Sequence, residues 1–268
     1  MTHTFRTLVG CATLAAGVWL VIAPALAGTP DLPADSYKKA ADADLKLLQK
    51  RLDELAKSEA PTARTAKPAV ASALLLAAYA DVLGDAAFKA EVLKVAELVE
   101  AKKYKDAAGA GAKLAIKPGT GKAGGDLPKL ESFEKAKDKD VTYLPATMKL
   151  YGNTTVLKLP AGMNIEKDLK DWTAKGAVGK IDPAAAELLA VRSAIINEYA
   201  YHNPNEKARS KPDSLKEWQK LSKESVDLSK DIVAEATKKA PDPKILRAKL
   251  TLLEAACTNC HGKFRFEE

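Results

Sequence analysis

Two cysteines and a histidine near the C-terminus form the most specific chemical pattern in this chain of 268 residues. Residues 257–261 read C-T-N-C-H, so Cys257 and Cys260 lie three positions apart and His261 follows directly. Residues three and four apart share a face of a helix. Both thiols can therefore form thioethers to the vinyl groups of one haem, and the His261 imidazole can reach the iron as an axial ligand. The pattern predicts a single, covalently attached haem c.

The same cysteines also permit a redox disulfide or half of a zinc site. A redox C-x-x-C motif of the thioredoxin type belongs to a βαβ unit, and the sequence indicates none. A tetrahedral zinc site needs four ligands, and only the distant His202 could complete Cys257, Cys260 and His261. Haem is the favoured interpretation, with zinc and a disulfide as the alternatives.

The N-terminus has the pattern of a secretory signal. His3 and Arg6 form a short polar start, residues 8–22 are largely apolar, and residues 25–27 read A-L-A, a typical cleavage site. We therefore expect residues 1–27 to be removed on export and the mature protein to be periplasmic. This location fits the predicted cofactor, because haem c is attached outside the cytoplasm.

The charge balance favours an ordinary solvated surface. The 42 Lys and Arg against 35 Asp and Glu give a net charge of +7, and loss of Arg6 with the leader leaves +6. The positive residues are interspersed with Asp and Glu, so we do not expect nucleic-acid binding. A mildly basic surface could steer an acidic redox partner, whose identity the sequence does not specify. Residues 69–80, the most apolar stretch after the leader, are too few to span a bilayer and are predicted to form a buried helix.

Nearly everything after the leader has the pattern of an all-α protein. Apolar residues recur at steps of three and four, which is the period of a helix that buries one face. A last helix follows Pro243 and contains the cysteine motif. The other predicted helices cover about residues 35–57, 68–84, 85–103, 105–115, 164–175, 183–202 and 214–239.

A glycine-rich break divides these helices into two predicted domains. Residues 117–128 are predicted to be a flexible linker. Residues 28–116 lack the motif and are expected to form a haem-free helical bundle that serves docking or dimerisation, a homodimer being one outcome. This bundle is either a degenerate copy of the haem domain or an unrelated one rich in the same Ala and Leu. Residues 129–268 are predicted to form the haem-binding bundle, with an irregular region over residues 130–162.

The last helix carries its apolar residues at alternating steps of four and three. This spacing places both cysteines on the seam that faces the core, with His261 at its border, and predicts a haem inside a helix bundle. The residues on this seam are Leu246, Leu250, Leu253, Cys257, Cys260 and Phe264.

The C-terminal motif and its surroundings resemble the cytochrome c-prime family and its low-spin, methionine-ligated relatives. These proteins are four-helix bundles with C-x-x-C-H in the last helix, typically followed two residues later by an aromatic residue and Arg. Phe264 and Arg265 match that ending. The resemblance is specific over the last two helices, extends back to about Thr142 and does not cover the N-terminal third. It implies a C-terminal four-helix bundle with a covalent haem whose iron is held by His261.

The resemblance also implies one of two functions, according to the sixth position of the iron. A methionine there gives a low-spin electron carrier, and residues 148–152, M-K-L-Y-G, resemble the Met-Lys-x-x-Gly segment of low-spin relatives. Met148 is therefore the first candidate, with Met163 and His202 as the others, although a lone Met more often packs in a core. An empty position gives a high-spin haem protein that binds NO or CO.

We expect a periplasmic monohaem c-type cytochrome that carries one electron, with the gas-binding protein as the alternative. The sequence indicates no general acid–base pair, catalytic triad or phosphate-binding loop, so an enzyme is not expected.

Overall fold

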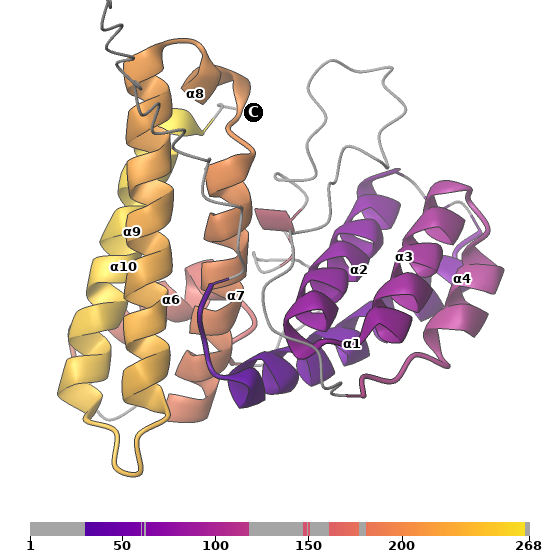
Figure 1. The fold of residues 1–268 in the computed structure, drawn as a ribbon, viewed down its shortest axis with the longest axis horizontal. Coiled ribbons are helices and arrows are strands. Elements are labelled where there is room, and N and C mark those ends of the chain that lie inside the picture. Colours follow the sequence, from indigo (N-terminus) through magenta and orange to yellow (C-terminus); the bar gives the residue numbers. More distant parts are fainter. Residues whose placement is uncertain are drawn as a thin grey trace, which may run out of the picture.

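The computed structural model describes residues 30–59, 61, 63–117, 147–148, 150, 161–176 and 181–265. Within these ranges the secondary structure is helical and contains no strand, which confirms the predicted all-α class. The leader, the predicted linker beyond Lys117 and most of the predicted irregular region lie outside the described residues. The helices form two groups side by side, coloured indigo to magenta and orange to yellow in Figure 1.

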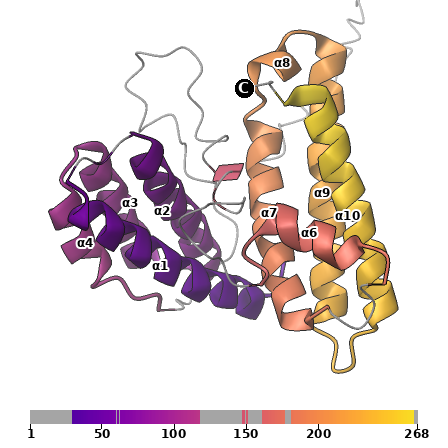
Figure 2. The ribbon, with the colours of Figure 1, turned by 180° about the vertical axis from the view of Figure 1, so that it is seen from behind.

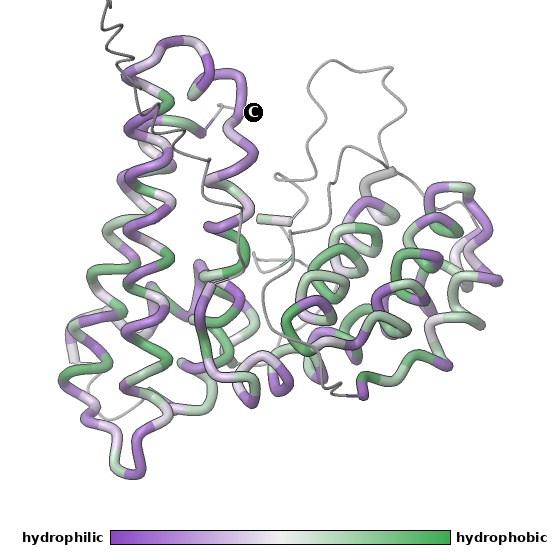
Figure 3. Tube along the Cα trace, viewed as in Figure 1, coloured by the Kyte–Doolittle hydropathy of each residue, from purple (hydrophilic) through white to green (hydrophobic). Residues whose placement is uncertain are grey.

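The first group has an apolar helix at its centre. It consists of α1 (Ala34–Lys57), α2 (Ala63–Leu83), α3 (Ala86–Glu100) and α4 (Tyr104–Gly111). Every residue from Ala69 to Ala80 of α2 is buried, as predicted, because α2 packs between α1 and α3. The stretch Thr65–Leu83 is long and apolar enough to cross a membrane, yet 78% of its most apolar window is buried inside the fold. Figure 3 shows green, hydrophobic positions in this group and also along the long helices of the other group.

The second group contains the cysteine motif. It consists of α6 (Ile165–Thr173), α7 (Pro183–His202), α8 (Glu206–Arg209), α9 (Pro212–Ala236) and α10 (Pro243–Phe264). Asp182 and Asp242 cap α7 and α10, and in each case a proline follows as the first helical residue. The Asp182 carboxylate accepts from the Ala184 amide at 3.1 Å, and the Asp242 carboxylate from the Lys244 amide at 2.8 Å. The predicted starts of these helices are thus confirmed.

Three long helices dominate the second group. Helices α7, α9 and α10 run side by side, and the shorter α6 packs against α10 (Figure 2). The fourth helix of this bundle, α6, has only 9 residues, so it covers the long helices over part of their length. Helix α1 of the first group also packs against α7.

The two groups share one hydrophobic core. A single cluster of buried side chains includes Tyr37 and Leu48 from α1, Ile195 from α7 and Leu250 from α10. The division into two domains at residues 117–128 remains a prediction, but the helices on its two sides are packed together by buried apolar surface.

Candidate haem-attachment site

The motif occupies the last two turns of α10. Leu246, Leu250, Leu253 and Phe264 are buried as the spacing predicts, and Ala256 joins them. Cys257 and Cys260 are half-buried and pack against the main core cluster. Both carry free thiols. The motif therefore presents two sulfurs from one helix toward the core.

The end of α10 is fixed by contacts from three other elements. The Phe264 ring meets the Trp218 ring of α9 edge to face, with centroids 5.3 Å apart and planes at 80°. The Trp218 indole donates to the Ala200 carbonyl of α7 at 2.6 Å. The Asn205 side-chain amide, at the start of α8, donates to the Phe264 carbonyl at 2.9 Å. These contacts position the motif in the bundle independently of any cofactor.

Both thiols are held in the protonated form. Burial raises the pKa of Cys257 to about 12, with a smaller contribution from the adjacent Cys260. Burial likewise raises the pKa of Cys260 to about 11. Thiol–disulfide exchange enzymes need a lowered thiol pKa, because the thiolate is the nucleophile, and zinc also binds the thiolate. The raised values are unlike those of thiol–disulfide exchange enzymes.

His261 lies at the exposed border of the motif and faces α6. Partial burial of its ring lowers its pKa, and the positive charge of Arg265 acts in the same direction. The Glu166 carboxylate opposes this effect and is paired with the Lys170 ammonium at 2.8 Å. A neutral imidazole is the form that ligates a metal, so the lowered pKa prepares His261 for this role near neutral pH.

Met148 lies in a short helical segment attached to α1. Its side chain is half-buried and packs against the main core cluster. The nearby Leu150 carbonyl accepts from the Arg51 guanidinium at 3.1 Å, and Arg51 also donates to the Ser72 hydroxyl at 2.5 Å. In Figure 1 this pink segment appears between the ribbons of α2 and α7. Met148 is thus positioned by the first helix group, whereas the motif belongs to the second.

The other two candidates for the sixth ligand are engaged elsewhere. Met163 is buried and packs with Leu47 of α1 in a small cluster separate from the main core. His202 is exposed rather than part of the apolar seam of α7, and its Nε2 lies 3.1 Å from the Glu198 carboxylate. Its ring also contacts the Tyr201 ring, with centroids 4.8 Å apart.

The zinc alternative lacks an assembled ligand set in the part of the chain that the structure describes. No three His, Cys, Asp or Glu side chains converge there on one point where a metal ion could sit. Haem attachment does not need such convergence, because the thioethers bind the porphyrin edge and only one protein nitrogen need reach the iron.

A buried hydroxyl near the motif was not anticipated from the sequence. Ser222 of α9 is 1% exposed, and its hydroxyl has no hydrogen-bond partner among the described residues. The available signal was the occurrence of Ser222, Ser225 and Ser229 on the apolar seam of α9, where larger residues are usual. Two free thiols beside a neutral imidazole, together with an orphaned polar atom at the same level of the bundle, fit a haem.

Comparisons with known proteins return no match. No family model, no curated protein and no solved structure matches this chain. The resemblance to cytochromes c-prime therefore depends on the motif residues themselves.

Proposed function

We propose that this chain is a periplasmic monohaem c-type cytochrome that carries one electron. The haem is attached through Cys257 and Cys260, and His261 is the axial ligand of the iron. One observation carries the proposal: the Cys257 and Cys260 thiols and the His261 imidazole lie in the last two turns of a helix whose end is fixed by its neighbours. A second protein in the same compartment would be the redox partner.

The thiols suit the attachment chemistry. Cys257 and Cys260 would hold the haem through two thioether bonds, each formed by addition of a thiol S–H across one vinyl double bond with no net gain or loss of electrons. When bound, the haem supplies the redox chemistry, as the iron alternates between ferric and ferrous forms.

The chain's own contribution is burial and orientation. Apolar residues of α10 and the Trp218–Phe264 contact exclude water from the core side of the motif. Low solvent access around an iron centre is one of the means by which a protein sets its reduction potential. The His261 ring stands on the other side, near the Glu166–Lys170 ion pair, whose charges act on its protonation.

The gas-binding alternative is supported by one observation. Met163 and His202, two of the three candidates for the sixth ligand, are already engaged by Leu47 and Glu198. If Met148 does not reach the iron either, the sixth position stays open to NO or CO.

Haem staining of a denaturing gel tests the proposal. The mature chain should show peroxidase activity that survives denaturation, and Cys257→Ser combined with Cys260→Ser should abolish it. Thr258→Ala is the matched control, because Thr258 is an exposed residue between the two cysteines and its loss should leave the stain unchanged. A colourless wild-type protein that contains stoichiometric zinc would refute the proposal.

Visible spectra with and without CO separate the two functions. An electron carrier with a sixth protein ligand should be low-spin and slow to bind CO. If the ferrous protein is high-spin and binds CO at once, gas binding is the function and electron transfer is not.

A further inference from the structure

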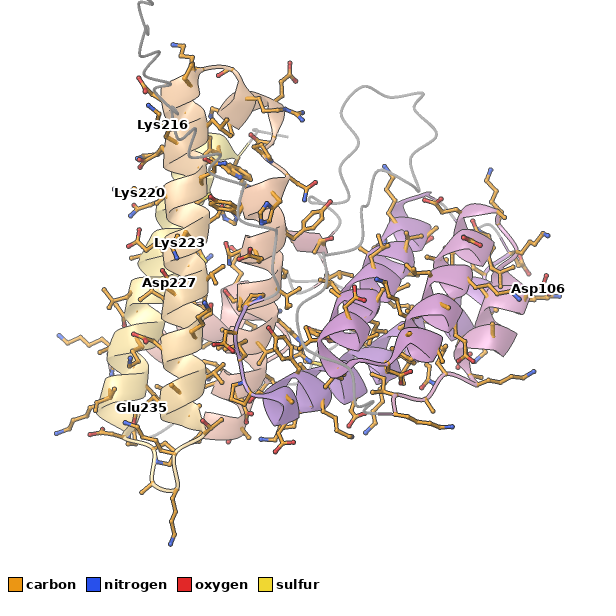
Figure 4. All side chains as sticks on the ribbon, in the orientation of Figure 1. Asp106, Lys216, Lys220, Lys223, Asp227 and Glu235 are labelled. Carbon is orange, nitrogen blue, oxygen red and sulfur yellow. The ribbon has the colours of Figure 1, made fainter. Side chains whose placement is uncertain are left out.

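The side of α9 that faces the bundle changes from large to small residues beside the motif. Trp218, Ser222, Ser225, Ser229 and Ile232 follow one another at steps of four and three, and all five are buried. The three in the middle are serines. The opposite side of α9 is charged: Lys220, Lys223 and Asp227 lie on its outer surface (Figure 4).

The register between α9 and α10 places two of these serines at the same level along the bundle as the cysteines. The two helices are antiparallel, and contacts at both ends fix their alignment: Trp218 with Phe264, and Lys249 with Asp231 at 3.0 Å. Ser222 lies four residues after Trp218, and Cys260 lies four before Phe264. By the same count of seven residues, Ser225 is level with Cys257.

The three serine hydroxyls differ in their hydrogen bonds. Ser225 donates to the Leu221 carbonyl at 3.0 Å, and Ser229 donates to the Ser225 carbonyl at 2.7 Å. Both bonds lie within the helix, four residues back. The Ser222 hydroxyl is equally buried but bonds to none of the described residues. A buried hydroxyl without a partner destabilises a fold, so an acceptor that arrives with a ligand explains its presence.

We propose that the Ser222 hydroxyl is a hydrogen-bond donor of the haem site, on a wall of small residues that α9 turns toward the motif. This inference rests on the proposed haem attachment. The acceptor is an oxygen or another lone-pair atom that the haem brings, either a propionate or a ligand on the iron. Ser225, at the level of Cys257, offers no free donor, because its hydroxyl bonds to the Leu221 carbonyl.

The test compares Ser222→Ala in the haem-loaded chain and in a haem-free full chain that carries Cys257→Ser and Cys260→Ser. In the haem-free chain the variant should raise the thermal midpoint, because it removes a buried hydroxyl that had no partner. In the loaded chain the same variant should lower the midpoint, because a hydrogen bond is lost. This reversal of sign between the two forms is the expected result.

Ser225→Ala is the matched control on the same helix face. The Ser225 hydroxyl donates to the Leu221 carbonyl in both forms. Ser225→Ala should therefore shift the thermal midpoint in the same direction with and without haem. If Ser222→Ala shifts both forms in one direction, as Ser225→Ala does, the Ser222 hydroxyl does not contact the haem and the inference is wrong. If the haem stain of the wild-type chain is negative, the proposed function is wrong and this inference falls with it. If the stain is positive and the midpoints behave as in the control, only this inference is wrong.

Two further readouts identify the acceptor. A bond to a ligand on the iron should shift the C–O stretching band of the ferrous CO complex when Ser222 becomes Ala. A bond to a propionate should instead leave that band in place and change how the midpoint potential depends on pH. If neither readout changes and the midpoint shows no reversal, the donor role is excluded.

Discussion

Arg192 of α7 and Asp44 of α1 form a buried ion pair that joins the two groups of helices. The Arg192 Nε lies 3.0 Å and 3.2 Å from the two carboxylate oxygens of Asp44. The Tyr79 hydroxyl donates to the same carboxylate at 3.0 Å, and Arg192 Nη1 donates to the Gly162 carbonyl at 2.7 Å. Arg192 therefore connects α7 with α1 and with the turn that precedes α6.

Removal of one partner of this pair should strongly destabilise the protein. Asp44→Asn leaves the Arg192 charge buried without its counter-ion, and we expect a loss of about 3–5 kcal/mol in the free energy of unfolding. Chemical denaturation followed by circular dichroism measures it. Lys38→Met is the control, because the Lys38–Asp42 pair is half exposed and should contribute only about 0.3–0.5 kcal/mol. Equal effects of the two variants would contradict the assigned role of the Asp44–Arg192 pair.

The C-terminal helices alone should be less stable than the full chain. A fragment that begins at Leu127 retains the motif but loses Asp44, and it exposes the surface of α7 that packs against α1. We expect it to take up haem, with a lower thermal midpoint and a lower yield of loaded protein than the full chain. Introducing Arg192→Met into the fragment removes the unpaired charge and should recover part of the lost thermal stability. A fragment as stable as the full chain would show that the first helix group does not stabilise the haem bundle.

The sixth ligand can be identified by comparing two methionine variants. If Met148 ligates the ferric iron, the wild type should show a weak absorption band at about 695 nm. Met148→Ala should remove this band and allow CO to bind the iron. Met163→Ala is the control: this buried side chain packs on Leu47, so its loss should cost about 2–5 kcal/mol of stability while the band stays. A spectrum that Met148→Ala leaves unchanged would assign Met148 to packing.

The loop between α9 and α10 should respond to acid through Glu235. The Lys238 ammonium, at 2.5 Å, and the Asp242 amide, at 3.1 Å, bind this carboxylate and lower its pKa from the usual 4.5. Because the pKa is lower in the folded protein, the stabilisation is complete above the unfolded value and disappears as the pH falls through the folded value. The thermal midpoint of wild type should exceed that of Glu235→Gln at neutral pH, and the two should converge on acidification.

If the thermal midpoints of wild type and Glu235→Gln differ by the same amount at every pH, the difference comes from packing and not from the charge of Glu235. Glu166→Gln offers a comparison on α6, where the Lys170 ammonium lowers the pKa of an exposed carboxylate. Its effect on the thermal midpoint should be smaller, because solvent screens that pair.

The helices and the local geometry of the motif could be read from the sequence, because both depend on neighbours in the chain. The Asp182-Pro183 step marked one helix start, Pro243 marked the boundary before the last helix, and the alternating spacing of leucines in α10 placed the cysteines on its inward side. Residues 257–261 define their chemistry by spacing alone. These features need no knowledge of which other helix lies opposite.

The partners across the bundle were decided only by the tertiary structure. The sequence separates Asp44 from Arg192 by 148 positions, and nothing local indicates that their charges meet in the core. His202 was expected on an apolar seam and is exposed, and its Nε2 lies 3.1 Å from the Glu198 carboxylate. Ser222 looked like an ordinary polar residue on a helix. Its meaning depends on the register of α9 against α10, which the packing of Trp218 on Phe264 sets and which no periodicity within either helix contains.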